Sequence, residues 1–150
     1  ICLVPEKRQE LTTEGGLDIK KNFNSLKSVV SELQESKALI SLFIEPDLDS
    51  IKLAKDLKVD AIELHTGKYA EAGASNKEVY LNQIKTASEY ANKLSLVVNA
   101  GHGLDYTNVK EIARINHMEE LNIGHSIIAE SIFLGLAEAI KKMKNLIESS

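Results

Sequence analysis

Two segments of the chain end an apolar run with the dipeptide Gly-His: residues 98–104 (VNAGHGL) and residues 121–126 (LNIGHS). Each leads into a helix-like segment, so imidazole rings and unhindered backbone N–H groups are expected to gather where strands end. An α/β enzyme uses such a place to hold a phosphate and to move protons.

His102 stands between two glycines, where the backbone can form turns that are closed to other residues. Its ring can project over the strand ends. Because an imidazole titrates near neutral pH, His102 is a candidate general acid or base. A turn with a solvent-facing histidine is the alternative. His117 lies between two helix-like pieces and is expected at the surface.

Backbone N–H groups are available at the turns and at a helix start, on Gly103, Gly124, His125 and Ser126. The dipole of a helix favours an anion at its N-terminus by roughly 0.3–1 kcal/mol. Two consecutive units of this kind match the phosphate site that barrels form after strands seven and eight. Ordinary turn chemistry would give the same pattern, so both interpretations stay open.

A carboxylate and an imidazole share one face of residues 61–65 (AIELH), because the two-residue period of a strand puts Glu63 and His65 on the same side. Such a pair can steer protons or stabilise a cationic, iminium-like intermediate. A structural ion pair in the core is the alternative. The polar segment 12–16 (TTEGG) could act as a lid or simply cross a barrel end.

The chain has no Cys/His metal spacing, no GxGxxG, no Walker A pattern and no GxSxG elbow. A zinc site could borrow His65, His102 and His125 from different strands, but phosphate or proton chemistry explains each of them as well. We therefore expect no metal.

Composition limits the class of protein. The 150 residues are 43% hydrophobic, which suits one domain with a real core. The net charge of −4, with scattered lysines, offers no footprint for nucleic acid. No apolar segment approaches the roughly 20 residues that span a bilayer. The single cysteine, Cys2, lies in an apolar run and is expected to be a buried structural thiol. These features predict a cytoplasmic protein without a membrane or nucleic-acid partner.

Five short apolar runs alternate with helix-like segments. The runs are residues 1–4, 38–44, 61–64, 96–99 and 120–123. Helices are predicted from a possible N-cap at Asp18, from a cap at Asp49, and over residues 76–94, 108–115 and 126–147. Mostly continuous apolar strands indicate a parallel sheet covered on both faces. Length favours a doubly wound sheet, whereas reactive residues at almost every strand end favour a (β/α)₈ barrel.

Several long blocks of the chain resemble the pyridoxine 5′-phosphate synthase family. They are residues 3–18 (LVPEKRQELTTEGGLD), 62–67 (IELHTG) with Tyr69-Ala70, 98–104 (VNAGHGL) and 120–128 (ELNIGHSII). The likeness runs from end to end and is far more specific than the short patterns above.

The resemblance implies an α/β (β/α)₈ TIM barrel with extra helices, of which residues 1–150 would be the C-terminal portion, about the last five βα units. It implies condensation of 3-amino-2-oxopropyl phosphate with 1-deoxy-D-xylulose 5-phosphate, giving pyridoxine 5′-phosphate, inorganic phosphate and water, without a redox or metal cofactor. His102 then resembles the proton donor and Glu63 the group that stabilises the transition state. Gly103, Gly124 and His125 resemble the phosphate cradle for the amino ketone, and Thr12 a contact to the deoxyxylulose phosphate.

The family forms homo-oligomers, often octamers. The chain would start at the fourth barrel strand, roughly 100 residues short of a barrel of about 250. We therefore expect it to fold as part of a complete barrel. His65 has no role in the resemblance and is kept as an orienter of Glu63 or of substrate. Another barrel enzyme on a phosphorylated sugar or amino ketone, such as an isomerase or epimerase, and a non-catalytic phosphate-binding module remain alternatives.

Overall fold

A computed structural model describes residues 1–5 and 15–150 and contains one parallel sheet in this part of the chain. The strands are β1 (Cys2–Leu3), β2 (Ser41–Ile44), β3 (Ala61–His65), β4 (Val97–Gly101) and β5 (Met118–Asn122). Each strand pairs in parallel with the next one in the sequence, so the spatial order is β1-β2-β3-β4-β5.

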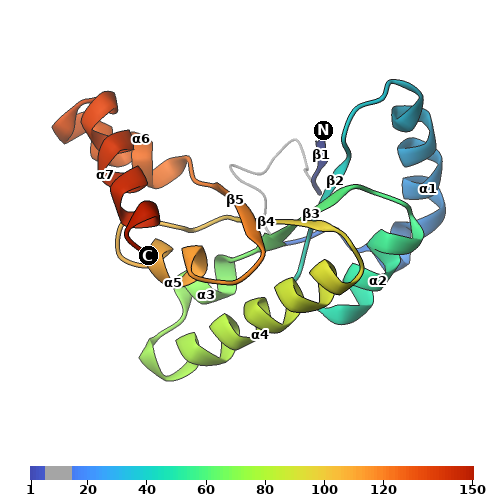
Figure 1. Ribbon diagram of the computed structural model, residues 1–150, viewed down its shortest axis with the longest axis horizontal. Helices are drawn as coiled ribbons and strands as arrows, with labels where there is room; N and C mark the ends of the chain where they lie inside the picture. The colour runs from blue at the N-terminus through green and yellow to red at the C-terminus, as the bar shows by residue number, and fades with distance from the viewer. Residues whose placement is uncertain (6–14) are drawn as a thin grey trace.

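The helices connect these strands. They are α1 (Ile19–Glu35), α2 (Leu48–Asp56), α3 (Gly67–Glu71), α4 (Ala74–Lys93), α5 (Val109–Ala113), α6 (His125–Leu134) and α7 (Leu136–Glu148). In Figure 1, α2, α4 and α5 lie on the same side of the sheet, below it in that view. No helix in the described part of the chain is long and apolar enough to cross a membrane.

Strand order decides between the two predicted architectures. A doubly wound sheet reverses its strand order at a switch point and carries helices on both faces. Here the order never reverses, and right-handed crossovers then put the connecting helices on one face. The chain is therefore a run of consecutive βα units of a TIM barrel. The doubly wound sheet, which length alone favoured, is wrong.

Side-chain alternation separates the two faces of this sheet. The helix-facing positions are apolar and fully buried, and they belong to one core with residues of α2, α4 and α5: Leu42, Ile44, Ile62, Leu64, Val98 and Ala100. The opposite face carries Phe43, Glu63 and Asn99, which are neighbours across β2, β3 and β4. The inner face of the barrel sector is thus largely polar.

Two predicted helix starts have different outcomes. Asp18 caps α1, as predicted, and its carboxylate accepts a bond of 2.9 Å from the backbone N–H of Lys21. The cap of α2 is Asp47 rather than Asp49. Asp47 has an extended backbone and accepts from the N–H of Ser50 at 2.8 Å, as an N-cap requires. Asp49 lies inside the first turn.

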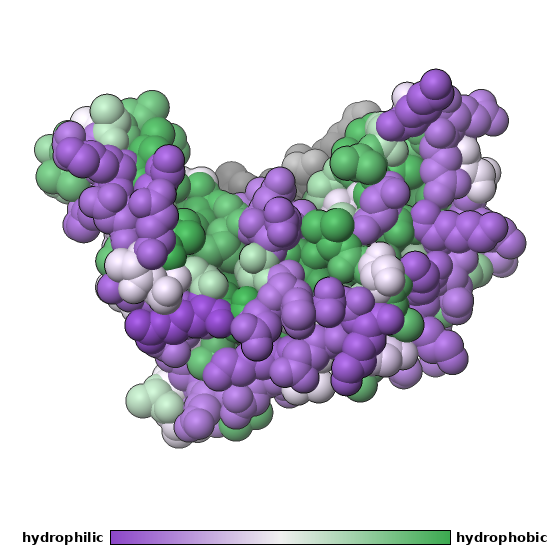
Figure 2. Space-filling model, in the orientation of Figure 1, coloured by the Kyte–Doolittle hydropathy of each residue, from purple (hydrophilic) through white to green (hydrophobic). Residues whose placement is uncertain are grey.

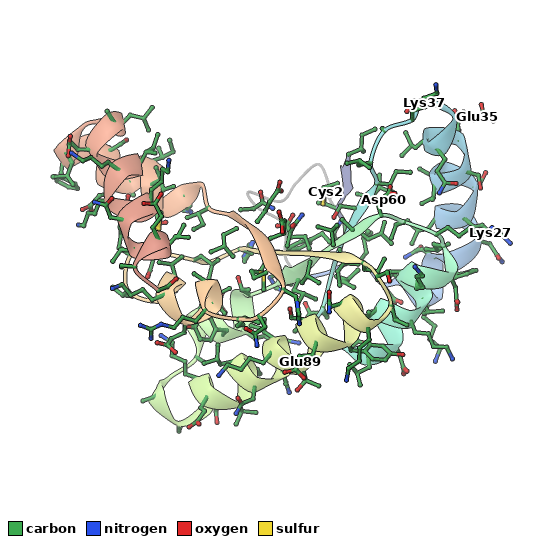
Figure 3. The ribbon with its side chains drawn as sticks, in the orientation of Figure 1. Cys2, Lys27, Glu35, Lys37, Asp60 and Glu89 are labelled. Atoms are coloured by element: carbon green, nitrogen blue, oxygen red, sulfur yellow. The ribbon has the colours of Figure 1, made fainter. Side chains whose placement is uncertain are left out.

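Three further expectations need correction. The short helix α3 was not predicted, because its five residues are too few to show a helical period of apolar positions. The closing helix is divided into α6 and α7 at Gly135, whose φ of +80° suits glycine. Cys2 is exposed rather than buried, because β1 lies at the edge of the sheet, on its open side (Figure 3).

Candidate active site

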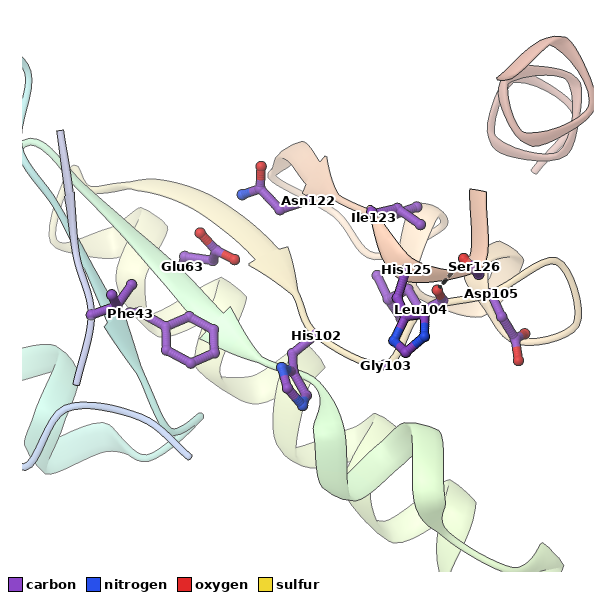
Figure 4. Close-up of a pocket in the computed structure, with 12 residues that line it drawn as sticks. Phe43, Glu63, His102, Gly103, Leu104, Asp105, Asn122, Ile123, His125 and Ser126 are labelled. Carbon is purple, nitrogen blue, oxygen red and sulfur yellow. Dashed lines mark hydrogen bonds between the residues drawn. The ribbon is translucent and has the colours of Figure 1, made fainter. Parts of the chain in front are cut away.

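The strand ends open onto a hollow of about 760 Å³. Figure 2 shows the molecule notched between the lobe of α6 and α7 and the lobe of α1, with apolar side chains in the notch. Five of the six predicted site residues line the hollow: Glu63, His102, Gly103, Gly124 and His125. Figure 4 shows Glu63 on β3, and His102, Gly103 and His125 in the segments that follow β4 and β5. The sixth, Thr12, lies outside the described residues.

His102 follows the last residue of β4 in a turn held from the neighbouring strand. Its φ is +82°, a conformation that a residue with a side chain adopts only when its surroundings hold it there. The buried Thr66 hydroxyl lies 2.7 Å from the carbonyl oxygen of Gly101 and 2.6 Å from that of His102, and donates to this pair. The backbone N–H of Thr66 also donates to Gly101 at 2.9 Å. The position of the imidazole is therefore set by the segment after β3.

The two residues beside His102 must be glycines, because a side chain at either position would collide with neighbouring atoms. Gly103 has a φ of +74°, and a Cβ atom there would come within 2.6 Å of the Ala70 Cβ on α3. A Cβ on Gly101 would collide with the Glu63 carboxylate and come within 3.0 Å of the Asn122 Cβ. The Gly-His-Gly sequence thus lets α3 and Glu63 approach the turn closely.

Glu63 lies half-buried on the inner face of β3. Burial raises the pKa of its carboxyl above the ordinary value, and hydrogen bonds from Cys2 and Asn122 oppose that shift. The Cys2 thiol lies 3.6 Å from Glu63 Oε2. Glu63 can therefore exchange a proton closer to neutral pH than an exposed glutamate can.

His65 contacts a different carboxylate from the one the strand pattern suggested. Its Nδ1 lies 2.7 Å from Oε1 of Glu45, the residue directly after β2, and not against Glu63. Glu45 also accepts from the Lys68 ammonium at 2.8 Å and from the Gly16 N–H at 3.1 Å. The hydrogen bond from His65 is the main cause that lowers the pKa of Glu45 to about 2.

Glu45 was not predicted as a site residue. The sequence offered only a weak signal, since Glu45 and His65 each directly follow an apolar run, and the register that pairs Ile44 with Leu64 decides that they meet. Two polar residues at neighbouring strand ends are candidates for contact. Asn122 was also missed as a site residue, although it lies two residues before Gly124 of the second Gly-His pair and lines the hollow.

The imidazole of His102 is partly shielded from water. Desolvation lowers the pKa of His102 below its ordinary value, and the charge of the nearby His65 lowers it further, while Glu71 acts in the opposite direction. The rings of His65 and His102 meet edge to face with centroids 4.8 Å apart. Burial therefore favours the neutral imidazole.

The start of α6 forms the other wall of the hollow. Gly124 is its N-cap and brings no side chain to the first N–H groups, which have no acceptor inside a helix. Ser126 donates its hydroxyl to the carbonyl oxygen of Leu104 at 2.8 Å, which fixes the helix start beside the turn after β4. These N–H groups are placed to receive an anion.

One carboxylate at this wall, that of Asp105, would repel an anion if it were free. Its Oδ1 instead accepts from the backbone N–H groups of Thr107 at 2.7 Å and Asn108 at 3.0 Å, and from the Thr107 hydroxyl at 2.7 Å. These bonds help to lower the pKa of Asp105. Three donors thus offset much of its charge.

Within residues 1–5 and 15–150, no three His, Cys, Asp or Glu side chains are grouped to hold a metal ion. The zinc set of His65, His102 and His125 is not assembled there. His117 is exposed, as predicted, and has a φ of +70°.

The consecutive barrel units define the class of protein as a TIM barrel. Its strand ends share one hollow with two imidazoles and with a helix N-terminus that could receive an anion. The family model "Pyridoxal phosphate biosynthesis protein PdxJ" matches residues 1–149, and the chain belongs to that family.

Curated relatives agree with this assignment. Proteins named pyridoxine 5′-phosphate synthase from Prochlorococcus marinus (strain AS9601) and Sulfurihydrogenibium sp. (strain YO3AOP1) are 52% and 53% identical over 147 residues, covering 98% of this chain. One from Legionella pneumophila (strain Corby) is 53% identical over 150 residues, covering 99% of it. The chain spans 60–62% of the length of these relatives.

Proposed function

We propose that the intact protein is a pyridoxine 5′-phosphate synthase that condenses 3-amino-2-oxopropyl phosphate with 1-deoxy-D-xylulose 5-phosphate. The products are pyridoxine 5′-phosphate, inorganic phosphate and water. One observation carries this proposal beyond likeness: residues from three separate strand ends, Glu63, His102 and His125, line one hollow. Its volume of about 760 Å³ lies within the range of small-molecule sites.

The phosphate of the amino ketone is assigned to the wall formed by Gly103, Gly124 and His125. The uncapped start of α6 supplies backbone N–H groups and the positive end of the helix dipole. The bond from Ser126 to Leu104 keeps these groups in place without movement when the anion arrives. Thr12 is proposed as a contact to the deoxyxylulose phosphate.

His102 is assigned as the proton donor. Before substrate binds, its lowered pKa favours the neutral ring. A phosphate anion bound at the adjacent wall favours the imidazolium, because an opposite charge nearby stabilises the charged form. Substrate binding would therefore load the proton that His102 later gives to a leaving oxygen.

Glu63 is assigned to the cationic stages of the reaction. Imine formation and dehydration place positive charge on nitrogen, and a carboxylate in a partly buried site stabilises that charge more strongly than one in water. The Cys2 thiol and Asn122 hold the carboxylate by hydrogen bonds, which favour its ionised form. Enclosure of the hollow from water would strengthen the interaction further.

We further propose that residues 1–150 fold as the C-terminal portion of one TIM-barrel domain in a cytoplasmic homo-oligomer, an octamer by family resemblance. Sedimentation of the intact protein would measure the oligomeric state.

The activity test supplies the intact protein with both substrates and follows pyridoxine 5′-phosphate and inorganic phosphate together. Equal amounts of the two products are expected, and the His102→Asn variant is the control. Turnover of another phosphorylated sugar or amino ketone, without pyridoxine 5′-phosphate, would point to an isomerase or epimerase. Phosphate binding without any turnover would point to a non-catalytic module.

A further inference from the structure

The buried imidazole of His65 is hydrogen-bonded to the Glu45 carboxylate, outside the hollow of the candidate site. His65 is 8% exposed, and its Nδ1 lies 2.7 Å from Glu45 Oε1. With a pKa of about 2, Glu45 is ionised at neutral pH and can only accept. The proton of this bond therefore resides on Nδ1, which fixes the orientation of the ring.

Two aromatic rings and Gly67 also pack around the ring of His65. The Phe43 ring meets it at a centroid distance of 5.2 Å and an angle of 69°, and the His102 ring at 4.8 Å and 61°. A Cβ on Gly67 would come within 2.6 Å of His65 Nε2 and within 3.1 Å of His102 Cδ2. Glycine at position 67 is what allows both rings to approach.

Nε2 of His65 is buried and has no hydrogen-bond partner among the described residues. A buried polar atom without a partner costs stability, so its position needs a compensating reason. The compensating contacts of this ring are the bond from Nδ1 to Glu45 and the edge-to-face contact with the His102 ring.

We propose that Glu45 and His65 are positioning residues for His102: Glu45 fixes the His65 ring, and the His65 ring holds the His102 imidazole toward the hollow. The inference rests on the proposed function, since it assigns a role to His102 in that reaction. Neither residue contacts the hollow with a group that must react, so each acts through His102. Fixing a catalytic group in this way should raise kcat strongly, because a displacement of about 1 Å can lower the rate roughly 100-fold.

Several titratable groups on different elements lie around His102. Glu71 lies on α3, and the same hollow carries a carboxyl on β3, one after β4 and an imidazole at the start of α6: Glu63, Asp105 and His125. Burial of the His102 ring disfavours its imidazolium and lowers its pKa, and the charge of His65 lowers that pKa further. Removal of His65 should therefore raise the pKa of His102 toward the ordinary value.

The kinetic test compares Glu45→Ala, His65→Ala and the double variant in the intact protein. Each single change should lower kcat by roughly 10- to 100-fold with KM nearly unchanged, and the double variant should lose little more than one of them. Glu45→Gln keeps an oxygen acceptor for Nδ1 and should restore most of the activity. Losses that multiply in the double variant, or no rescue by glutamine, would overturn the proposal.

Lys68→Met is the matched control, because it removes the other partner of the same carboxylate. Lys68 is 63% exposed, and an exposed ion pair contributes little, so kcat should stay within about threefold of wild type. A loss as large as that of Glu45→Ala would show that the carboxylate does not act through His65.

A second measurement does not depend on turnover. In protein with isotope-labelled histidines, the His102 signal is assigned by its loss in His102→Asn, and its titration is followed by NMR. The pKa of His102 should rise in His65→Ala. An unchanged titration in a folded variant would refute the positioning role. Absence of pyridoxine 5′-phosphate formation would instead refute the proposed function, and the titration would still decide this inference.

Discussion

The two Gly-His turns are nearly alike in sequence but differ in backbone conformation and in surroundings. At Gly101-His102-Gly103 the chain passes through positive φ angles at His102 and Gly103 and is held by Thr66 and by α3. At Gly124-His125 the helix α6 begins at once, and a Cβ at Gly124 would meet nothing within 4 Å.

The difference follows from what packs against each turn. The first is pressed between the end of β3 and α3, so its imidazole is partly buried and meets a second imidazole. The second lies at the open wall, where His125 is exposed and the unpaired groups are backbone N–H groups. The first turn is therefore suited to proton transfer by a side chain, and the second to anion binding by its backbone, as we propose.

The largest expected effect separates the two histidines by kinetics. His102→Asn should lower kcat by about 10²- to 10⁴-fold, the usual contribution of a general acid. His125→Asn should raise KM by less than about tenfold and leave kcat nearly intact, because its backbone N–H is retained. Steady-state kinetics on both variants measures this. Equal losses of kcat would mean that the two turns do not differ in role.

The two glycines should differ in stability. Gly103→Ala forces a side chain into a positive φ and against the Ala70 Cβ, so it should destabilise the fold by about 1–3 kcal/mol. Gly124→Ala has open space and a negative φ and should cost less than about 1 kcal/mol. Denaturant unfolding of the intact protein measures both. A Gly124→Ala variant that is the less stable of the two would contradict the comparison.

The pH dependence of activity should differ between the free enzyme and the substrate complex. As the proposed donor, His102 gives up a proton only as imidazolium, so activity should fall as pH rises through its pKa. Burial lowers that pKa, so the kcat/KM profile should fall at a pH below the ordinary histidine pKa. Bound phosphate should move the corresponding limb of kcat upward by at least about one pH unit. Both limbs should vanish in His102→Asn; coincident limbs in the wild type would argue against loading by substrate.

The smallest effect concerns the support behind the first turn. The pKa of Glu45 is lowered from 4.5 to about 2 in the folded protein, so its contribution to stability is complete above about pH 4.5 and is lost as pH falls toward 2. Glu45→Gln should therefore flatten the stability profile in that window, measured by denaturant unfolding at several pH values. An equally steep profile in the variant would show that Glu45 is not responsible.

Much of this site could be predicted from local pattern. The two-residue period placed Glu63 on the polar face of β3, and the Gly-His pairs marked the ends of β4 and β5. The partner of His65 could not be predicted, because Glu45 is 20 positions away and the contact depends on the register of β2 with β3. The exposure of Cys2 depends on the place of β1 in the sheet.

The sequence by itself determined the elements, the inward side of β3 and the two turns, because these depend on residues only a few positions apart. The tertiary structure decided the strand order, and with it the barrel rather than the doubly wound sheet. It also decided that His65 contacts Glu45 and His102, and that only one Gly-His turn is enclosed. Such contacts are fixed by strand register and helix packing, which join surfaces far apart in the chain and leave no mark within a short stretch of it.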